Sequence, residues 1–376
     1  MTAGQIRSLW GRVLTDGEEL PPARVSIAEG RIVAIEPAAR ALPGDLVVDT
    51  GWIAPGLIDL QVNGAAGVDL TSSSDIAAVA RTLAAHGVTA FCPTVVSSPC
   101  SLILDRLATY GPRAIGGGAT SLGAHIEGPF LDPVHRGVHD PAVLRDASHD
   151  EIEAWLQAGQ PAIVTLAPER PGGLSAIAQL VEAGVVVSLG HAGADADQAQ
   201  AGINAGARMG THLFNGMSPL HHRQPGLVGA LLASDAVVGL IADGVHVHPL
   251  VIDLVVRRAG VRRVALVSDA LAAASAPPGE SVLGEQRVIS EGHVVRRADG
   301  TLAGSAMLLD ACLRNVRAWL PDVPPAEVVQ MTTGTPAALL GCARKGRVVV
   351  GGDADLVILD AAFNVQLTLI GGETVA

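Results

Sequence analysis

The arrangement of apolar and polar positions divides the chain into two β-rich ends and a longer middle region. Near the start, VSIAEGRIVAIEP (25–37) places two β-branched runs on either side of Glu29-Gly30, which predicts a hairpin. The end of the chain is similar, because GRVVVGGDADLVILD and NVQLTLIGGETVA alternate short strands with Gly-rich turns. We therefore expect the two ends to pair into one small β-sandwich domain made of residues 1–52 and 346–376.

The middle region repeats a different unit, an apolar run followed by a stretch with helical spacing, such as 75–87 and 249–260. Continuous apolar runs that alternate with helices indicate a parallel sheet buried on both faces. Eight such units favour an α/β fold, a (β/α)8 TIM barrel, over residues 53–345. No GxGxxG follows the first run, which argues against a dinucleotide-binding sheet. The eight runs are LIDLQV, VTAFCPT, SLGAHIE, AIVTLAP, VVVSLGH, RMGTHLF, VVGLIAD and VALVSDA.

Composition supports a large core and narrows the range of partners. Apolar residues make up 49% of the chain but aromatic residues only 2%, so the core must consist mainly of Val, Leu, Ile and Ala. The net charge of −12 argues against nucleic acid or an anionic membrane as a partner, although a local basic pocket could still hold an anion. Because the N-terminus has no signal-type apolar segment and no run reaches about 18 apolar residues, we expect a cytoplasmic protein.

A restricted set of polar side chains stands at or just beyond the end of most of these runs. In a barrel the carboxyl ends of all strands open on one mouth, so residues far apart in sequence meet there. A single His or Asp after an apolar run has ordinary explanations, such as a loop residue or a helix cap. Their repetition at several strand ends is difficult to explain in that way. The residues are Gln61, Asn63, His125, Glu127, His191, His212, Asp243, His246 and Asp269.

The chemistry of these side chains fits together. Glu127, His191 and His212 supply one carboxylate and two imidazoles, the ligand set of a catalytic divalent metal with an open position for water. Such a metal makes hydroxide available near neutral pH, and Asp269 could take the remaining proton and pass it to a leaving group. Zn²⁺ is the first choice, and Fe²⁺ or Mn²⁺ would accept the same ligands.

Two features of the sequence predict one metal ion and not two. Gln61 and Asn63 lie on one face of the first strand, where a pair of histidines would suit a second ion, but amides are poor ligands for a transition metal. The only lysine in the chain, Lys345, lies after the barrel, so a carboxylated lysine that bridges two ions is not expected. The two amides would then orient water or substrate beside a single ion.

With these residues assembled, the chain resembles the amidohydrolase superfamily, and within it the family of N-acetylglucosamine-6-phosphate deacetylases. PGLIDLQVNG (55–64) resembles the first-strand motif of that family, which has Gln and Asn where most amidohydrolases have HxH. The resemblance runs from about residue 20 to the C-terminus. The other motifs, in the family's order, are HIEGPFL (125–131), RGVH (136–139), LGHAGAD (189–195), THLFNGM (211–217), HHRQPG (221–226), DGVHVHP (243–249) and VSDA (267–270).

The resemblance implies a metal-dependent hydrolase that converts N-acetylglucosamine 6-phosphate to glucosamine 6-phosphate and acetate. It makes Glu127, His191 and His212 the metal ligands. Asp269 becomes the catalytic acid and base, and His246 polarises the acetamide carbonyl or holds a sugar hydroxyl.

The resemblance also implies a phosphate site, formed by Asn215 and Gly216 with Arg223 as the charge partner and His139 nearby. The forked guanidinium of arginine matches the geometry of a phosphate. In the family this site can borrow a residue across a dimer interface, which leads us to expect a homodimer. The chain departs from the family pattern at Ala192, Gly216 and Gln224, and none of these changes removes a metal ligand or the catalytic acid.

Two kinds of alternative stay open. Another amidohydrolase would act on N-acetylgalactosamine 6-phosphate, an N-acyl amino acid or a cyclic amide, although Arg223 weighs against an amino-acid acylase. A non-catalytic sugar-phosphate-binding protein of the same fold would be expected to have lost a metal ligand or the acid.

Overall fold

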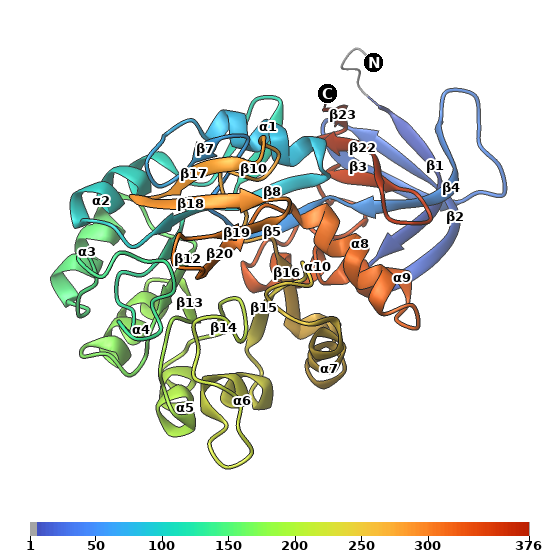
Figure 1. Ribbon diagram of the computed structural model, residues 1–376. Helices are drawn as coiled ribbons and strands as arrows, with labels where there is room; N and C mark the ends of the chain where they lie inside the picture. The colour runs from blue at the N-terminus through green and yellow to red at the C-terminus, as the bar shows by residue number, and fades with distance from the viewer. Residues whose placement is uncertain (1–5, 376) are drawn as a thin grey trace.

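The computed structural model describes residues 6–375, which form two parts (Figure 1). One part is a seven-stranded sheet built from both ends of the chain, on the right of Figure 1. The other part contains parallel strands with helices around them. The strands of the terminal sheet, in spatial order, are β23 (Glu373–Thr374), β22 (Val365–Ile370), β21 (Leu356–Leu359), β4 (Leu46–Pro55), β1 (Ser8–Thr15), β2 (Glu18–Ala28) and β3 (Arg31–Pro37).

Pairing of β4 with β21 joins the two ends of the chain. Leu356 lies opposite Pro55 in an antiparallel ladder, and β1 pairs with the other edge of β4. The seven strands form one hydrogen-bonded sheet, because β4 has strands from both ends of the chain as neighbours; the predicted β-sandwich arrangement stays a prediction. The hairpin predicted at Glu29-Gly30 is confirmed, with positive φ at both turn residues. The predicted outer limits of this domain, residues 1 and 376, lie outside the described residues.

All eight apolar runs of the middle region form strands, and each strand pairs in parallel with the next along the chain. Nearly every residue of these strands is buried, as expected for a sheet covered on both faces. The α/β class predicted from the sequence is therefore confirmed. The strands are β5 (Leu57–Val62), β8 (Val88–Val96), β11 (His125–Glu127), β12 (Ile163–Leu166), β13 (Val186–Leu189), β14 (Met209–Gly210), β15 (Val237–Ile241) and β16 (Val264–Val267).

The first and last of these eight strands also meet. Val62 forms a parallel bridge with Ala270, and the Asp269 N–H donates a hydrogen bond of 3.1 Å to the carbonyl of Gln61. The carboxyl ends of β5 and β16 are therefore neighbours, so the polar residues that follow the eight strands can gather at one place.

Helices lie on the outside of the parallel strands (Figure 1). In the first helix, α1, Ile76, Val79 and Leu83 form one buried apolar stripe that packs against the strands, and the side chain of Asp75 caps the N-terminus. None of the helices within residues 6–375 is both long and hydrophobic enough to cross a membrane. They are α1 (Ile76–Ala85), α2 (Cys100–Thr109), α3 (His149–Ala158), α4 (Gly173–Glu182), α5 (Ala196–Asn204), α6 (Gly226–Ala233), α7 (Pro249–Ala259), the 3₁₀ helix η1 (Val261–Arg263), α8 (Leu309–Trp319), α9 (Pro325–Gln330) and α10 (Gly334–Leu339).

A small antiparallel sheet that was not predicted from the sequence is inserted between β16 and α8. The Ser305 N–H donates to the carbonyl of Asp269 and the Leu271 N–H to the carbonyl of Ser305, both at 2.9 Å, so the insert is fixed beside the end of β16. Its strands are β17 (Gly279–Leu283), β18 (Gln286–Glu291), β19 (Val294–Arg296) and β20 (Leu302–Ser305). The remaining short strands are β6 (Gly64–Ala65), β7 (Val68–Asp69), β9 (Arg113–Ile115) and β10 (Gly118–Ser121).

Candidate active site

Four of the predicted site residues stand at the ends of parallel strands, and three of them have an unusual backbone. Glu127 is the last residue of β11. His191, His212 and Asp269 each lie two residues beyond the end of their strand, with φ of 49°, 29° and 49°. A non-glycine residue in this region costs about 1–3 kcal/mol, and such strain is concentrated at functional sites. The same local turn therefore follows three strands and brings three side chains to one cavity.

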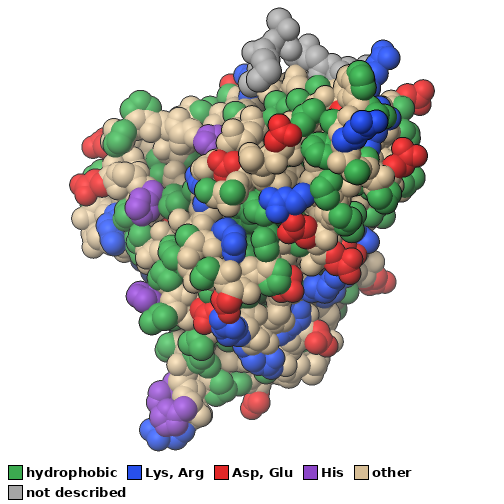
Figure 2. All heavy atoms as spheres, turned by 90° about the vertical axis from the view of Figure 1, so that its right-hand side faces the viewer, with side chains coloured by type: hydrophobic (Ala, Val, Ile, Leu, Met, Phe, Trp, Pro, Cys, Tyr) green, Lys and Arg blue, Asp and Glu red, His purple; other side chains and the backbone are tan. Residues whose placement is uncertain are grey.

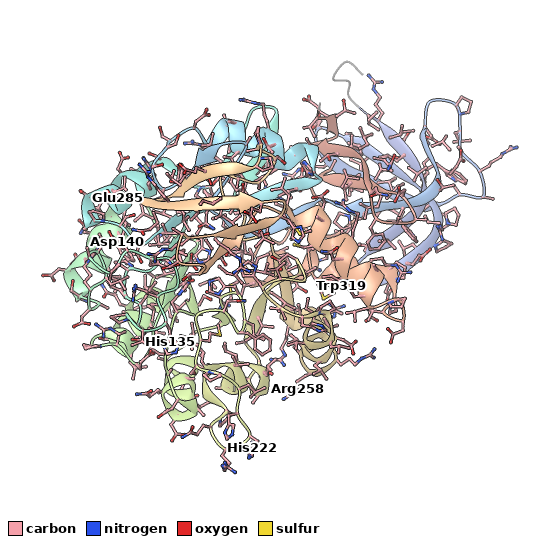
Figure 3. All side chains as sticks on the ribbon, in the orientation of Figure 1. His135, Asp140, His222, Arg258, Glu285 and Trp319 are labelled. Atoms are coloured by element: carbon pink, nitrogen blue, oxygen red, sulfur yellow. The ribbon has the colours of Figure 1, made fainter. Side chains whose placement is uncertain are left out.

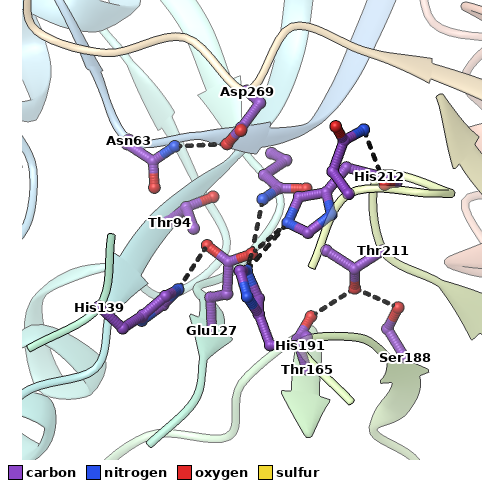
Figure 4. Close-up of polar contacts among 12 residues, drawn as sticks. Asn63, Thr94, Glu127, His139, Thr165, Ser188, His191, Thr211, His212 and Asp269 are labelled. Carbon is purple, nitrogen blue, oxygen red and sulfur yellow. Dashed lines mark hydrogen bonds and ion pairs between the residues drawn. The ribbon is translucent and has the colours of Figure 1, made fainter. Parts of the chain in front are cut away.

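Glu127, His191 and His212 form a tight buried cluster (Figure 4). Oε1 of Glu127 lies 3.0 Å from Nε2 of His212 and 3.4 Å from Nε2 of His191. The two imidazole Nε2 atoms are 3.1 Å apart. Three donor atoms at this mutual spacing can surround one small divalent cation at the usual ligand distance of about 2.0–2.2 Å.

The tautomer of His191 supports a metal-binding role. Its Nδ1 lies 2.9 Å from the backbone carbonyl of His135, which can only accept, so the proton is on Nδ1. Nε2 then presents a lone pair to the cluster, as a metal ligand must. The donor set of Glu127, His191 and His212 therefore fits a divalent metal ion.

The electrostatics of the cluster also favour a cation. Burial alone would raise the pKa of Glu127, but hydrogen bonds and charges from His191 and His212 hold that pKa well below its usual value. Burial would lower the pKa of His212, yet the hydrogen bond and charge of Glu127 outweigh it and raise the pKa overall. The site thus holds a buried negative charge that must be balanced, either by a proton on His212 or by a metal.

His139 lies in this cluster, with Nε2 3.8 Å from Oε2 of Glu127. The ligand atoms of Glu127, His139 and His191 all lie within 4.8 Å of one another, so His139 could also be considered as a ligand. However, its Nδ1 accepts a hydrogen bond of 3.3 Å from the Ser97 N–H, and burial together with the charge of His191 lowers its pKa to about 3. The ring is therefore neutral with its proton on Nε2, which makes His139 a hydrogen-bond donor toward the site.

Gln61 and Asn63 hold the two carboxylates of the site. The Gln61 amide donates a hydrogen bond of 2.9 Å to Oε1 of Glu127, and the Asn63 amide donates one of 2.7 Å to Oδ1 of Asp269. All four side chains are buried. In the structure the amides hold Glu127 and Asp269 in place, and their expected role in orienting water or substrate stays a prediction. The carbonyl oxygen of Asn63 has no partner among the described residues and remains available at the cavity wall.

Asp269 has an environment suited to proton transfer. Burial and the neighbouring charge of Glu127 raise its pKa to about 6, although His212, His246 and the Asn63 amide pull in the other direction. A carboxyl group whose pKa is close to the working pH can both accept and return a proton. Its place on the same cavity as the Glu127 cluster is therefore consistent with a general acid and base.

The cavity of about 210 Å³ around these residues brings together most of the predicted site. His246 is held by Asp243, whose Oδ2 lies 2.7 Å from Nδ1 of the ring and whose Oδ1 accepts the His246 N–H at 2.8 Å. Asp243 therefore orients His246. The residues from the insert, Leu283, Thr301, Leu302 and Gly304, complete the wall and were missed from the sequence. The predicted residues on the wall are Asn63, Glu127, His139, His191, His212, Asn215, Gly216, His246 and Asp269.

Arg223 is not among the described residues that line this cavity. It is exposed in the turn of a short bridge between His221 and Gln224. Figure 3 shows the neighbouring His222 at the tip of a loop that projects below α5 and α6, and Figure 2 shows His and basic side chains on that projection. Arg223 therefore does not contact this cavity of its own chain.

A buried hydrogen-bond chain below the cluster was also missed. Nδ1 of His125 lies 2.9 Å from the carbonyl of Leu60 and Nε2 lies 2.7 Å from Oγ1 of Thr165. Because the carbonyl fixes the proton on Nδ1 and burial lowers the pKa of the ring, Thr165 must donate to Nε2. Thr165 contacts Thr211 at 2.7 Å, and Thr211 contacts Ser188 (Figure 4). The sequence signal was a hydroxyl residue inside three successive apolar runs.

The parallel strands, the buried Glu–His–His cluster and the opposed Asp define a hydrolase of the amidohydrolase type, and residues 52–375 match the Amidohydrolase family. The chain belongs to that family. The N-acetylglucosamine-6-phosphate deacetylase of Danio rerio is 40% identical over 346 residues, which cover 86% of this chain and 84% of that protein. The N-acetylgalactosamine-6-phosphate deacetylase of Escherichia coli O157:H7 is 39% identical over 373 residues, covering 96% and 97%.

A solved structure of an enzyme with the same name as the Danio rerio relative is also similar to this chain. A mutant N-acetyl-D-glucosamine-6-phosphate deacetylase of Mycobacterium smegmatis, in complex with N-acetyl-D-glucosamine-6-phosphate, is similar with a TM-score of 0.91 and 33% identity, over 99% of this chain and 100% of that one. The resemblance stated from the sequence is confirmed, and with it the prediction of an enzyme. The similarity extends over both parts of the fold.

Proposed function

We propose that the protein hydrolyses the N-acetyl group of N-acetylglucosamine 6-phosphate and releases glucosamine 6-phosphate and acetate. The observation that carries the proposal is the single cavity on which Glu127, His191 and His212 lie together with Asp269. The names of the relatives at 40% and 39% identity support the substrate class. The proposal takes the eight parallel strands as a closed (β/α)8 barrel with this cavity at its mouth.

Glu127, His191 and His212 would hold one divalent metal ion, with Zn²⁺ as the first choice and Fe²⁺ or Mn²⁺ as alternatives. When bound, such an ion supplies Lewis acidity, which lowers the pKa of a water and stabilises negative charge on the amide oxygen. A second ion is not expected, because the first strand offers only the amides of Gln61 and Asn63. Lys345 is held elsewhere, 3.1 Å from Asp353.

The residues of the chain divide the proton and charge movements between them. Asp269 takes a proton from the water whose oxygen attacks the carbonyl carbon, and then returns it to the amide nitrogen as the C–N bond breaks. His139 donates its Nε2–H to the carbonyl oxygen as negative charge develops there. We assign this task to His139 in preference to His246, because His139 lies beside Glu127.

The sugar and its phosphate are assigned to the opposite side of the cavity. His246, oriented by Asp243, would contact a sugar hydroxyl or the phosphate, and Asn215 and Gly216 would offer donors from the loop after β14. No Lys or Arg lines the cavity among the described residues, although a phosphate needs a charge partner. We therefore propose that Arg223 reaches the phosphate of a second subunit in a homodimer.

N-acetylgalactosamine 6-phosphate is the second candidate substrate. The E. coli relative named for it aligns with 96% of this chain over 97% of its own length. The test is acetate release from the two 6-phosphorylated N-acetyl sugars and from unphosphorylated N-acetylglucosamine. We expect much faster release from a phosphorylated sugar. Equal rates with and without phosphate would contradict the phosphate-site assignment, and the faster epimer identifies the substrate.

A further inference from the structure

A second cavity lies directly beside the catalytic one and shares part of its wall. Its volume is about 260 Å³, compared with about 210 Å³ for the catalytic cavity. Val96, Val138, His139 and Leu283 line both. Because His139 Nε2 is 3.8 Å from Glu127, the second cavity begins next to the position where the scissile carbonyl would lie. None of the steps proposed above uses this space.

The wall of the second cavity suits an apolar group. Its apolar side chains are Val96, Pro99, Leu102, Val138, Val143 and Leu283.

The hydroxyl groups of this wall are already engaged. Oγ1 of Thr71 accepts the Val96 N–H, Ser97 Oγ lies 2.8 Å from Nδ1 of His139, and Ser98 donates to the carbonyl of Val96. A ligand that enters the cavity would therefore find hydrophobic surface and few unpaired donors.

The charges on this wall exclude an anionic group. Asp140 and Glu285 both line the cavity, and Figure 3 shows them on the same side of the molecule, near the turn between β17 and β18. No Lys or Arg lines it among the described residues. A phosphate or carboxylate would be repelled there, and the apolar side chains of the wall favour a neutral, apolar occupant.

The order of the strands indicates which part of a substrate would enter. The second cavity lies at the end of β8 and over the loop that follows β11, whereas Asn215, Gly216 and His246 follow β14 and β15. In a ring of eight strands β8 stands opposite β14 and β11 opposite β15, because four places separate each pair. With the carbonyl carbon between Glu127 and Asp269, the sugar extends to one side and the acyl chain to the other.

We propose that the second cavity is an acyl pocket, and that the protein also hydrolyses 6-phosphorylated glucosamines whose N-acyl group is neutral and longer than acetyl. This inference rests on the proposed function. The reaction is the same: one water is consumed, the amide C–N bond breaks, the nitrogen takes a proton through Asp269, and the longer carboxylate leaves in place of acetate. Acetyl itself reaches only the shared wall and does not fill the pocket.

The test compares kcat/KM for N-acetyl- and N-butanoyl-glucosamine 6-phosphate, with release of acetate and butanoate measured directly. We expect kcat/KM for the butanoyl substrate to lie within about tenfold of that for the acetyl substrate, because the hydrophobic pocket would accommodate the additional methylene groups. Leu102→Trp, on α2, fills the pocket and should lower kcat/KM for the butanoyl substrate roughly tenfold or more while sparing the acetyl substrate. Val143→Phe, in the segment between β11 and α3, fills the same pocket and repeats the test if the Trp variant folds poorly.

Ser101→Trp is the matched control, because Ser101 is exposed on the same helix and does not line the pocket. Acetate release without measurable butanoate release would overturn the acyl pocket and leave the proposed function intact. Butanoate release that is equal in Leu102→Trp and Ser101→Trp would also overturn it, because the chain would then lie elsewhere. If neither substrate is hydrolysed, the proposed function fails and the acyl pocket fails with it.

Discussion

Asn63 and Asp269, 206 positions apart in the chain, are joined by a hydrogen bond of 2.7 Å in the buried wall of the catalytic cavity. Two residues earlier, on β5, Gln61 makes the corresponding bond of 2.9 Å to Glu127. Each amide must present its N–H₂ to the carboxylate, because the opposite orientation would bring two acceptors together. Two residues at and just beyond the end of β5 thus hold both the carboxylate proposed to bind the metal and the carboxylate proposed to transfer the proton.

The two amides should therefore have separable effects. Gln61→Leu removes a support of the proposed ligand Glu127, and we expect the Kd for the metal to rise about 10–100-fold. Asn63→Leu should leave metal affinity close to that of the unmodified protein but lower kcat, because it frees Asp269. Competition with a chelator gives the Kd and steady-state assays give kcat. Equal loss of metal in both variants would contradict the division.

His139 should act as a donor and not as a ligand. His139→Phe removes the N–H beside Glu127, and we expect kcat to fall about 10²–10³-fold. His139→Gln keeps an amide donor and should recover part of this loss. Metal content should stay the same in both variants. A fall in metal content with either substitution would instead assign His139 to the ligand set.

Thr165 should stabilise the site through His125. Thr165→Val keeps the shape of the side chain but leaves the buried Nε2 of His125 without its donor, and we expect a loss of about 1–3 kcal/mol in the free energy of unfolding. Thr165→Ser keeps the hydroxyl and is the matched control. Urea denaturation of the three proteins is the measurement. If the Val variant were as stable as the Ser variant, the hydrogen bond donated by the Thr165 hydroxyl to Nε2 of His125 would be contradicted.

Activity should decline toward acid pH, because the proposed mechanism needs Asp269 in its ionised form. Burial and the charge of Glu127 raise the pKa of Asp269 to about 6, and a group with a raised pKa loses its base form as the pH falls through that value. A bound cation would lower this pKa, so we expect the acid limb of kcat/KM to have its midpoint at or below about 6. A pH profile of kcat/KM checks this. A midpoint well above 6 would show that another group controls activity.

The strands, and the meeting of Glu127, His191 and His212 in one cluster, could be predicted from the sequence because their signal is local. Each of the eight apolar runs is buried on both faces, so its composition alone separates it from the amphipathic helices. Glu127, His191 and His212 each stand at or near the end of such a run, and parallel pairing brings strand ends together without further information.

The terminal sheet, the inserted antiparallel sheet and the positions of the loop residues depend on contacts between segments that are distant in sequence. The terminal sheet is continuous only because β4 meets β21, and a hairpin pattern at either end does not show whether the ends share a sheet. The insert has an alternating pattern in QRVISE, but it stands where the repeat leads one to expect a helix. His139 and Arg223 lie in loops without periodicity, so their distances from the cavity follow from the path of the chain and not from its pattern.

We propose that Glu127, His191 and His212 hold one metal ion while Asp269 moves the proton. Asp269→Asn tests it most directly, because Asn tolerates the positive φ at this position and keeps the shape of the side chain. Metal content and acetate release from N-acetylglucosamine 6-phosphate should be measured on the same preparations. We expect one metal ion per subunit in both proteins and a loss of about 10²–10⁴-fold or more in turnover for the variant. Two ions per subunit, or appreciable acetate release by the variant, would contradict the account.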